Sequence, residues 1–407
     1  MPIRPRQAAR WLQVTLLSLA NKVAPRRAIA VVHGYPFTEG NAVEMVGALR
    51  RRYGGRVVWL VDDVDRARLW STSCGVDLGG VEVMPHRSLR GMVAYVSAEV
   101  VCFTHGLYGD LAPSRRTTIV NLWHGDGFKA NSLSKAGGGA RYRADVLVRS
   151  TTWLNDLRSR ELVMPIEDIV VVGSPRTDQF YREVDLDLRV LGLPPERPFV
   201  LWMPTFRKSR AIGLTVGNDD VASSDTSASQ LRDGMVRATE ILAAAGISLV
   251  IKPHPLDVET FGTPGLNTIT NDQLVDEGVQ LYELMGRAAA LVTDYSSAWV
   301  DYLVLDRPIG FVVPDEAEYA GGRGLAVSDA LDWLPGPRVE TDDDWRAFAR
   351  AVIDIDDAGA TRRAEVRRHI GLATSTTVAD DLVDALDARG AFARSGGARP
   401  RGQISSL

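Results

Sequence analysis

Short apolar segments alternate with segments of helical periodicity over the first 180 residues of the chain. Apolar residues at positions 42, 45, 46 and 49, for example, recur at the spacing of one helical face. Strands separated by helices in this way are typical of a parallel, doubly wound sheet. Seven runs of β-branched and apolar residues predict the strands, at 28–34, 56–63, 80–86, 99–106, 117–122, 145–151 and 168–175.

The same alternation starts again after a turn-like, Leu- and Pro-rich segment at 186–198. A long polar loop is expected at 209–230. Two Rossmann-like halves predict an α/β, GT-B-like enzyme whose domains face each other across a cleft. The further strands are expected at 199–207, 247–255, 267–270, 291–294 and 308–315, and the helices at 231–245, 279–290, 297–305, 342–354, 360–372 and 375–388.

This pattern divides the 407 residues into four parts, which matches the two domains expected of a chain of this length. The four parts are an N-terminal amphipathic segment, a first Rossmann-like domain, a second Rossmann-like domain and a tail that we expect to be disordered, at 1–27, 28–180, 181–390 and 391–407 respectively.

Charge and cysteine content exclude several functional classes. The formal net charge of −4 gives no reason to expect a nucleic acid partner. The two cysteines, Cys74 and Cys102, argue against a disulfide framework and fit a reducing cytosol. No apolar run approaches the ~20 residues that a membrane span requires.

The N-terminal segment has an apolar stripe that is flanked by basic residues. Trp11, Leu12, Leu16 and Leu19 fall on one helical face, with arginines and a lysine on both sides. This pattern is typical of a helix that lies on an anionic membrane surface. An ordinary packing helix gives the same pattern. A signal peptide is a third interpretation, but the segment has a poor apolar core for one.

The run TTIVNLWHGDGFKAN at 117–131 predicts a strand that ends at Trp123-His124-Gly125. Ligands of open α/β sheets bind at the carboxyl ends of the strands, so His124 is expected at a ligand-binding edge. Gly125 and Gly127 allow the backbone to approach a ligand closely. Simple packing of Trp123 and His124 is the alternative.

Several cations and hydroxyls also follow directly on predicted strands, which suggests a phosphate site. Ser296 and Ser297 begin a predicted helix, where unpaired N–H groups favour anions, although a serine there is also an ordinary helix cap. Arg176, Arg207 and Lys252 stand at other strand ends, and together they indicate a nucleoside diphosphate. The chain contains no Walker motif and no G-x-G-x-x-G fingerprint.

His254 lies between Pro253 and Pro255, which restrict the backbone around it. A fixed imidazole suits acid catalysis or a phosphate contact, and a structural hydrogen bond is the alternative. Asp301 is expected to reach the ligand or an N-terminal backbone, and a solvated surface charge is the alternative for both Asp294 and Asp301. No histidine or cysteine spacing matches a metal site, and no cofactor is indicated. His33, His86, His105 and His369 receive no role.

In order and spacing, five motifs resemble the CDP-glycerol glycerophosphotransferase family of teichoic acid and capsule synthesis. They are NLWHGDGFK, VVGSPRTDQF, LWMPTFRK, IKPHP and LVTDYSSAWVDYLVLDRP. The resemblance implies a GT-B fold and transfer of an alditol phosphate from CDP-glycerol or a related CDP-alditol to a lipid-linked or polymeric acceptor. It also implies a protein that is peripheral on the inner face of the cell membrane.

For the site, the resemblance implies His124 as general base and His254 as a second catalytic or pyrophosphate-binding histidine. Trp123, Gly125, Asp126 and Gly127 belong to the same loop. One departure concerns this loop, because Gly127 stands where the family usually has proline. Asp126 is expected to bring a negative charge near the pyrophosphate. The donor contacts that the resemblance implies, together with neighbouring strand-end residues, are Arg176, Pro204, Thr205, Arg207, Lys252, Pro253, Ser296, Ser297 and Asp301.

Two other functions remain compatible with the sequence. A GT-B glycosyltransferase that uses a nucleotide sugar shares the fold and the phosphate-binding end. A catalytically inactive, membrane-associated scaffold in polymer assembly is the other, although the presence of both His124 and His254 argues against it. Release of CMP indicates the alditol-phosphate transferase, whereas release of UDP from a nucleotide sugar indicates the glycosyltransferase.

Overall fold

The computed structural model describes most of the chain. Predicted site residues His254 and Arg207 lie outside the described residues, as do the first 14 residues and the chain beyond residue 392. The described ranges are 15–108, 116–129, 144–184, 186–205, 225–253, 265–314, 316, 324–354 and 358–392. In the helix that begins at residue 225, the side chains are described from residue 232.

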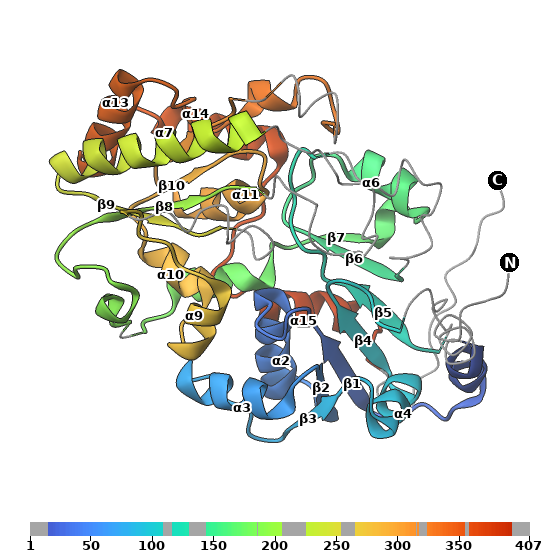
Figure 1. Ribbon diagram of the computed structural model, residues 1–407. Coiled ribbons are helices and arrows are strands. Elements are labelled where there is room, and N and C mark those ends of the chain that lie inside the picture. The colour runs from blue at the N-terminus through green and yellow to red at the C-terminus, as the bar shows by residue number, and fades with distance from the viewer. Residues whose placement is uncertain are drawn as a thin grey trace, which may run out of the picture.

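The first domain is built on a seven-stranded parallel sheet with the strand order β3-β2-β1-β4-β5-β6-β7 (Figure 1). Each strand pairs in parallel with its neighbours, as the alternation of strands and helices predicts. The strands are β1 Ile29–His33, β2 Arg56–Val61, β3 Val81–Pro85, β4 Val100–Phe103, β5 Thr118–Asn121, β6 Val146–Arg149 and β7 Ile169–Val171.

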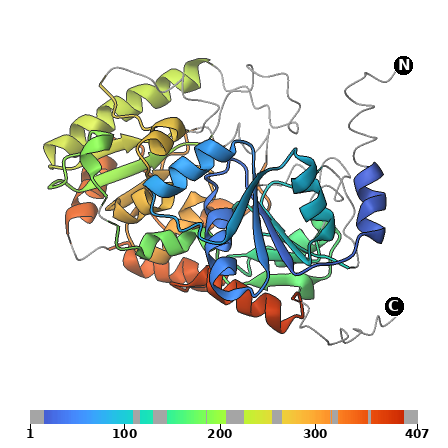
Figure 2. The same ribbon diagram turned by 90° about the horizontal axis from the view of Figure 1, so that it is seen from below.

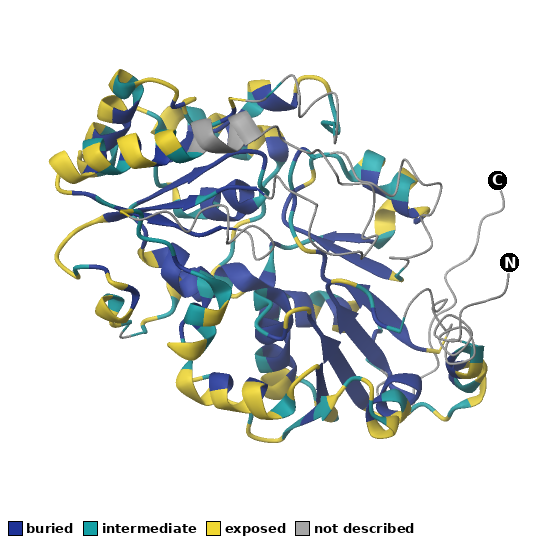
Figure 3. Ribbon diagram, viewed as in Figure 1, coloured by how far each residue is buried: buried dark blue, intermediate teal, exposed yellow. Residues whose placement is uncertain are grey.

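Alternate residues of these strands enter two different cores. Val32 and Trp59 pack with α2, α3 and α15 on one face, whereas Val31 and Val58 pack with α4 and Leu17 on the other. The buried strands stand out in Figure 3. The helices are α2 Gly40–Arg52, α3 Val64–Ser73, α4 Leu89–Ser97, α6 Asn155–Leu162 and α15 Val378–Ala388.

The second domain has a four-stranded parallel sheet with the order β11-β10-β8-β9. Helices α7 and α13 cover one face, and α9, α10, α11 and α14 contribute to the other side. The elements are β8 Phe199–Met203, β9 Ser248–Ile251, β10 Ala290–Thr293, β11 Ile309–Phe311, α7 Asp225–Ala244, α9 Asn271–Asp276, α10 Leu281–Arg287, α11 Ala298–Tyr302, α13 Asp342–Ile353 and α14 Ala360–Ile370.

The last helix returns to the first domain. Figure 2 shows α15, in red, running beside the blue elements of that domain along the lower edge of the view. Ala379, Leu382 and Leu386 of this helix are fully buried in the core that α2 also lines. The sequence-based division placed the whole of 181–390 in the second domain, and α15 departs from it because its apolar face completes the core of the first.

Two arginines connect the domains. Arg176 lies in the 3-10 helix η3 (Pro175–Tyr181), and Arg182 directly follows this helix. The Arg176 guanidinium lies between Asp301 of α11 and Glu39, the N-cap of α2. Arg182 is paired in the same way with Glu44 of α2 and Glu283 of α10. Each arginine therefore bridges a carboxylate of the first domain and a carboxylate of the second.

The predicted elements correspond closely to the structure, and the clearest differences concern the start of one helix and one predicted strand. Helix α7 begins at Asp225, within the segment that was expected to be a loop. The predicted strand at 267–270 is reduced to a single bridge between Ile251 and Thr268. Among the described residues, no helix combines the length and the hydropathy that crossing a bilayer requires.

Candidate active site

The loop after β5 turns His124 outward at the carboxyl edge of the first sheet. Asn121 Oδ1 accepts a hydrogen bond from the Trp123 N–H at 2.9 Å, and Asn41 donates to the Trp123 carbonyl at 3.4 Å. These contacts hold Trp123 at φ 58°, a left-handed conformation that bulky residues rarely adopt and that is found most often at functional sites. Trp123 is thereby buried, and His124 is exposed.

The two glycines of this loop lie directly against the second domain. A Cβ on Gly125, which has φ 149°, would stand 2.1 Å from Ser297 Oγ and 3.3 Å from an Arg176 nitrogen. A Cβ on Gly127 would stand 3.1 Å from Ser297 Cβ. The family's proline is therefore replaced at a position where the backbone itself packs on Ser297. The His124 loop and the start of α11 form one continuous surface.

Asp126 does not face this surface, which corrects the expectation from the sequence. Its carboxylate is buried and pairs with Arg149 Nε at 2.7 Å. It also accepts hydrogen bonds from the backbone N–H and hydroxyl of Ser150 at 2.7 and 2.9 Å, and from the Thr151 N–H at 3.2 Å. Asp126 thus stabilises the loop through Arg149, Ser150 and Thr151, and its charge is already paired within the protein.

Arg176 and Asp301, both expected to contact the donor, are instead bonded to each other. Arg176 Nη2 donates to Asp301 Oδ2 at 2.6 Å, and the Tyr282 hydroxyl donates to the same oxygen at 2.6 Å. The guanidinium also lies 4.9 Å above the Tyr282 ring. Burial alone would lower the pKa of Arg176, but Asp301, Tyr282 and Glu39 raise it above its ordinary value. The charge of Arg176 is therefore already matched within the protein.

Asp294, to which the sequence assigned no definite role, organises the carboxyl ends of β8 and β10. Its two oxygens accept from the Thr205 N–H at 3.0 and 2.9 Å, and from the Thr205 hydroxyl at 2.9 Å. The Ser296 N–H donates to Asp294 at 3.3 Å. Pro204 is buried beside them. One buried carboxylate thus holds Thr205 and Ser296 side by side.

Lys252 is the most unusual charge at this edge. It follows β9, is only 4% exposed, and donates from Nζ to the Pro253 carbonyl at 3.1 Å. Burial lowers the pKa of Lys252 to about 8. In the part of the chain that the structure describes, no carboxylate forms an ion pair with it. A buried ammonium without a counter-charge is costly, and an anionic ligand would supply that charge.

His105, which received no role from the sequence, lies beside His124. Their rings are stacked with centroids 5.0 Å apart and an angle of 29° between the planes. The centroid of the Trp123 ring lies 4.8 Å from that of the His124 ring. The only signal for His105 in the sequence was its position after the strand that ends at Phe103.

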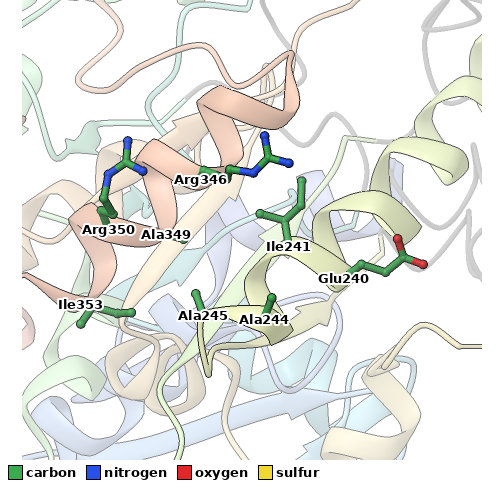
Figure 4. Close-up of a pocket in the computed structure, with 8 residues that line it drawn as sticks. All are labelled: Glu240, Ile241, Ala244, Ala245, Arg346, Ala349, Arg350 and Ile353. Carbon is green, nitrogen blue, oxygen red and sulfur yellow. The ribbon is translucent and has the colours of Figure 1, made fainter.

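Within the described residues, no group of three or more histidine, cysteine or acidic side chains is arranged to hold a metal ion. A shallow depression between α7 and α13 is lined by Ile241, Ala244 and Ile353 together with Arg346 and Arg350 (Figure 4). It lies where α7 leads into the amino end of β9, opposite the strand ends described above, and we assign it no part in the site.

Comparison with known proteins agrees with this arrangement. The family model described as CDP-Glycerol:Poly(glycerophosphate) glycerophosphotransferase matches residues 18–375. A teichoic acid poly(ribitol-phosphate) polymerase of Bacillus spizizenii is 25% identical over 63% of this chain and 42% of its own length. A teichoic acid glycerol-phosphate primase of the same organism is 26% identical over 53% of this chain and 56% of its own. The chain spans about half the length of the curated relatives it matches.

Solved structures share the fold. The wall teichoic acid polymerase TagF superposes with a TM-score of 0.67 at 17% identity, over 95% of this chain and 98% of that chain. A UDP-N-acetylglucosamine 2-epimerase from Listeria monocytogenes gives a TM-score of 0.53 at 13% identity, over 92% and 99% of the two chains. The predicted GT-B-type architecture is confirmed.

Proposed function

Because the chain belongs to the CDP-glycerol:poly(glycerophosphate) glycerophosphotransferase family, we propose that it transfers glycerol phosphate, or another alditol phosphate, from a CDP-alditol to an acceptor hydroxyl and releases CMP. The acceptor is a lipid-linked or polymeric intermediate of a teichoic-acid-like or capsule polymer. One observation carries the proposal. The loop of the exposed His124 packs directly on Ser297, at the edge of the second sheet where Lys252 is buried.

His124 is the general base of this reaction. Its imidazole is exposed, so an acceptor hydroxyl can reach it, and the buried Trp123 on one side and His105 on the other restrict its ring. A histidine titrates near neutral pH and suits this task. The glycines after it bring the base close to the second domain without intervening side chains.

The donor pyrophosphate occupies the opposite side of the site. Lys252 supplies the positive charge, because its ammonium is buried and lacks a carboxylate partner in the described part of the chain. Ser296 and Ser297 stand at the start of α11, next to Thr205, where Asp294 fixes the backbone. Arg207 and His254 follow β8 and β9 in the sequence and remain proposed donor-side residues.

Arg176 acts through its neighbours rather than on the donor. Its guanidinium is 8% exposed, is held by Asp301 and Glu39, and lies against the position of Gly125. It therefore positions the His124 loop against Ser297. Asp126 supports the same loop from the other side through Arg149.

The reaction is an in-line displacement at phosphorus. His124 takes the proton of the acceptor hydroxyl, whose oxygen forms a bond to the β-phosphorus of the CDP-alditol. The bond from that phosphorus to the bridging oxygen breaks, and CMP leaves with the oxygen and its electron pair. Lys252 and the N–H groups around Ser296 stabilise the charge that develops on the pyrophosphate, a contribution that is large in sites shielded from water.

Nucleotide release tests the proposal. Purified protein is incubated with CDP-glycerol, CDP-ribitol or UDP-sugars together with a hydroxyl acceptor, and CMP and UDP are quantified by chromatography. We expect CMP from at least one CDP-alditol, in amounts that depend on the acceptor. UDP from a nucleotide sugar, with no CMP from either CDP-alditol, would refute the proposal in favour of a glycosyltransferase.

We further propose that the protein binds the inner face of the cell membrane through the helical residues 15–23. Leu16, Leu19 and Val23 are 56%, 56% and 77% exposed, whereas Leu17 packs into the first domain. Apolar side chains beside basic residues such as Lys22 favour an anionic lipid surface.

Co-sedimentation with anionic liposomes tests this part. A variant with serine at the three exposed positions Leu16, Leu19 and Val23 should lose binding. The matched control is Val163→Ser, which removes an equally exposed apolar side chain (64%) after α6. Equal sedimentation of both variants would contradict the membrane proposal.

A further inference from the structure

Three neighbouring strands of the first sheet end in histidines. His33 is the last residue of β1, His105 follows β4, and His124 follows β5. These strands are adjacent in the order β1-β4-β5 and pair in parallel, so their carboxyl ends lie side by side. The sequence separates these residues widely, and only the sheet brings them to one edge.

The middle histidine is held in register with the proposed base. The His105 ring stacks on His124 at 5.0 Å, and its Nδ1 lies 3.0 Å from the Thr104 hydroxyl. Thr104 is completely buried, whereas His105 itself is exposed. With Nδ1 engaged by the protein, Nε2 is the ring atom that remains for a ligand beside His124.

Two of the histidines at this edge, His33 and His105, have lowered pKa values. His33 Nδ1 donates to the Leu60 carbonyl at 2.8 Å, and burial lowers the pKa of His33. Desolvation of the ring by the surrounding protein is the main cause that lowers the pKa of His105 to about 4, and the Arg176 charge adds to it, although the residue as a whole is exposed. Both rings are therefore neutral at neutral pH.

The charges nearest to this edge do not favour an anion. Arg176 is the cation that His105 faces, and Asp301 and Glu39 already balance it. A neutral ring with one remaining nitrogen, next to a base that takes up a hydroxyl proton, is suited to hold a second hydroxyl. The ligand class that fits is a diol, in which two carbons next to each other carry hydroxyl groups.

We propose that His105 is an acceptor-binding residue that hydrogen-bonds the hydroxyl next to the attacking one, so that the enzyme selects diol acceptors over simple alcohols. This proposal rests on the transfer reaction proposed above and names a residue that determines which acceptor binds. His124 binds the attacking hydroxyl, and His105 binds its neighbour on the adjacent strand end. The acceptor is thereby held in one orientation relative to the base.

The neighbouring His86 provides a matched control. His86 follows β3 at the same edge, and its ring centroid lies 5.5 Å from that of His33. Its Nδ1 contacts an Asp62 oxygen at 2.8 Å, and Arg87 donates to its Nε2 at 3.2 Å. Both nitrogens are occupied by the protein, so His86 has no atom for an acceptor hydroxyl. His86→Gln should leave the acceptor preference and the turnover unchanged.

The test compares kcat/KM for a diol acceptor and for its analogue that lacks the second hydroxyl, measured as CMP release from CDP-glycerol. Wild-type protein should prefer the diol. His105→Phe keeps a ring to stack on His124 and removes the hydrogen bond, so the preference should fall about tenfold, the size of one neutral hydrogen bond. His105→Asn keeps a hydrogen-bonding group without the ring, and it should retain more of the preference while kcat falls.

The possible results separate this inference from the proposed function. An unchanged diol preference in His105→Phe, with the protein active, would overturn the inference alone. A loss of preference in His86→Gln equal to that in His105→Phe would also overturn it, since the effect would then come from the edge as a whole. Absence of CMP release from wild-type protein with either acceptor and with every CDP-alditol would overturn both.

Discussion

Replacing Lys252 by methionine should change stability and activity in opposite directions. The substitution leaves an unbranched, slightly shorter side chain and removes a buried ammonium whose only polar contact among the described residues is the Pro253 carbonyl. Burial lowers the Lys252 pKa from 10.5 to about 8. At about 1.4 kcal/mol per pH unit, this difference corresponds to about 3 kcal/mol of lost stability at neutral pH.

The sign of this effect depends on pH. The folded state holds the Lys252 proton less tightly than the unfolded state, so the penalty is fully present below pH 8. As the pH rises from about 8 to 10.5, the unfolded protein binds more protons than the folded protein, and wild-type protein gains stability relative to the variant. Lys252→Met should therefore be more stable at pH 7, and the advantage should shrink toward pH 10.5.

Urea denaturation at pH 7 and pH 10 measures the stability, and CMP release measures the activity. The variant should gain up to about 3 kcal/mol at pH 7 and lose most of its donor affinity. CDP-glycerol at a hundred times its Kd should stabilise wild-type protein by about 2.7 kcal/mol but not the variant. Exposed Lys22→Met is the control. A clear loss of stability in Lys252→Met at pH 7, or unchanged protection by CDP-glycerol, would refute the reasoning.

Three further substitutions test the loop after β5. His124→Ala should lower kcat by about 10²–10⁴ without loss of stability, and wild-type turnover in a folded variant would remove the proposed base. Asp126→Asn should cost about 3 kcal/mol in urea denaturation, because it leaves Arg149 buried without its partner; a raised donor KM at unchanged stability would restore the donor-side role expected from the sequence. Gly125→Ala should lower both kcat and Tm, since its Cβ would stand 2.1 Å from Ser297 Oγ, and normal values of both would show that the loop does not contact Ser297.

Sequence patterns located the strand ends correctly because local apolar runs determine where a strand stops. His124, Thr205, Lys252 and Ser296 all lie at the carboxyl ends of strands, as expected. These positions depend on residues close in the chain, and the parallel sheet then brings the carboxyl ends of its strands to one edge.

The partners of the charged residues were not accessible from the sequence. Asp126 and Arg149 are 23 residues apart, and Arg176 and Asp301 are 125 apart. Both pairs form only when strands or domains come together. From the sequence, three of these four charged groups were expected near the ligand, whereas in the structure the four form two ion pairs.

The two arginines that follow β7 also have a mechanical consequence. Arg176 joins Glu39, the N-cap of α2, to Asp301, and Arg182 joins Glu44 of α2 to Glu283. Other contacts between the domains lie away from these arginines, at the Arg66–Asp272 ion pair and at the bridge between Lys129 and Leu325. The domains are therefore joined at several separated points, and segment 175–182 carries two of the ion pairs that resist a change in their relative orientation.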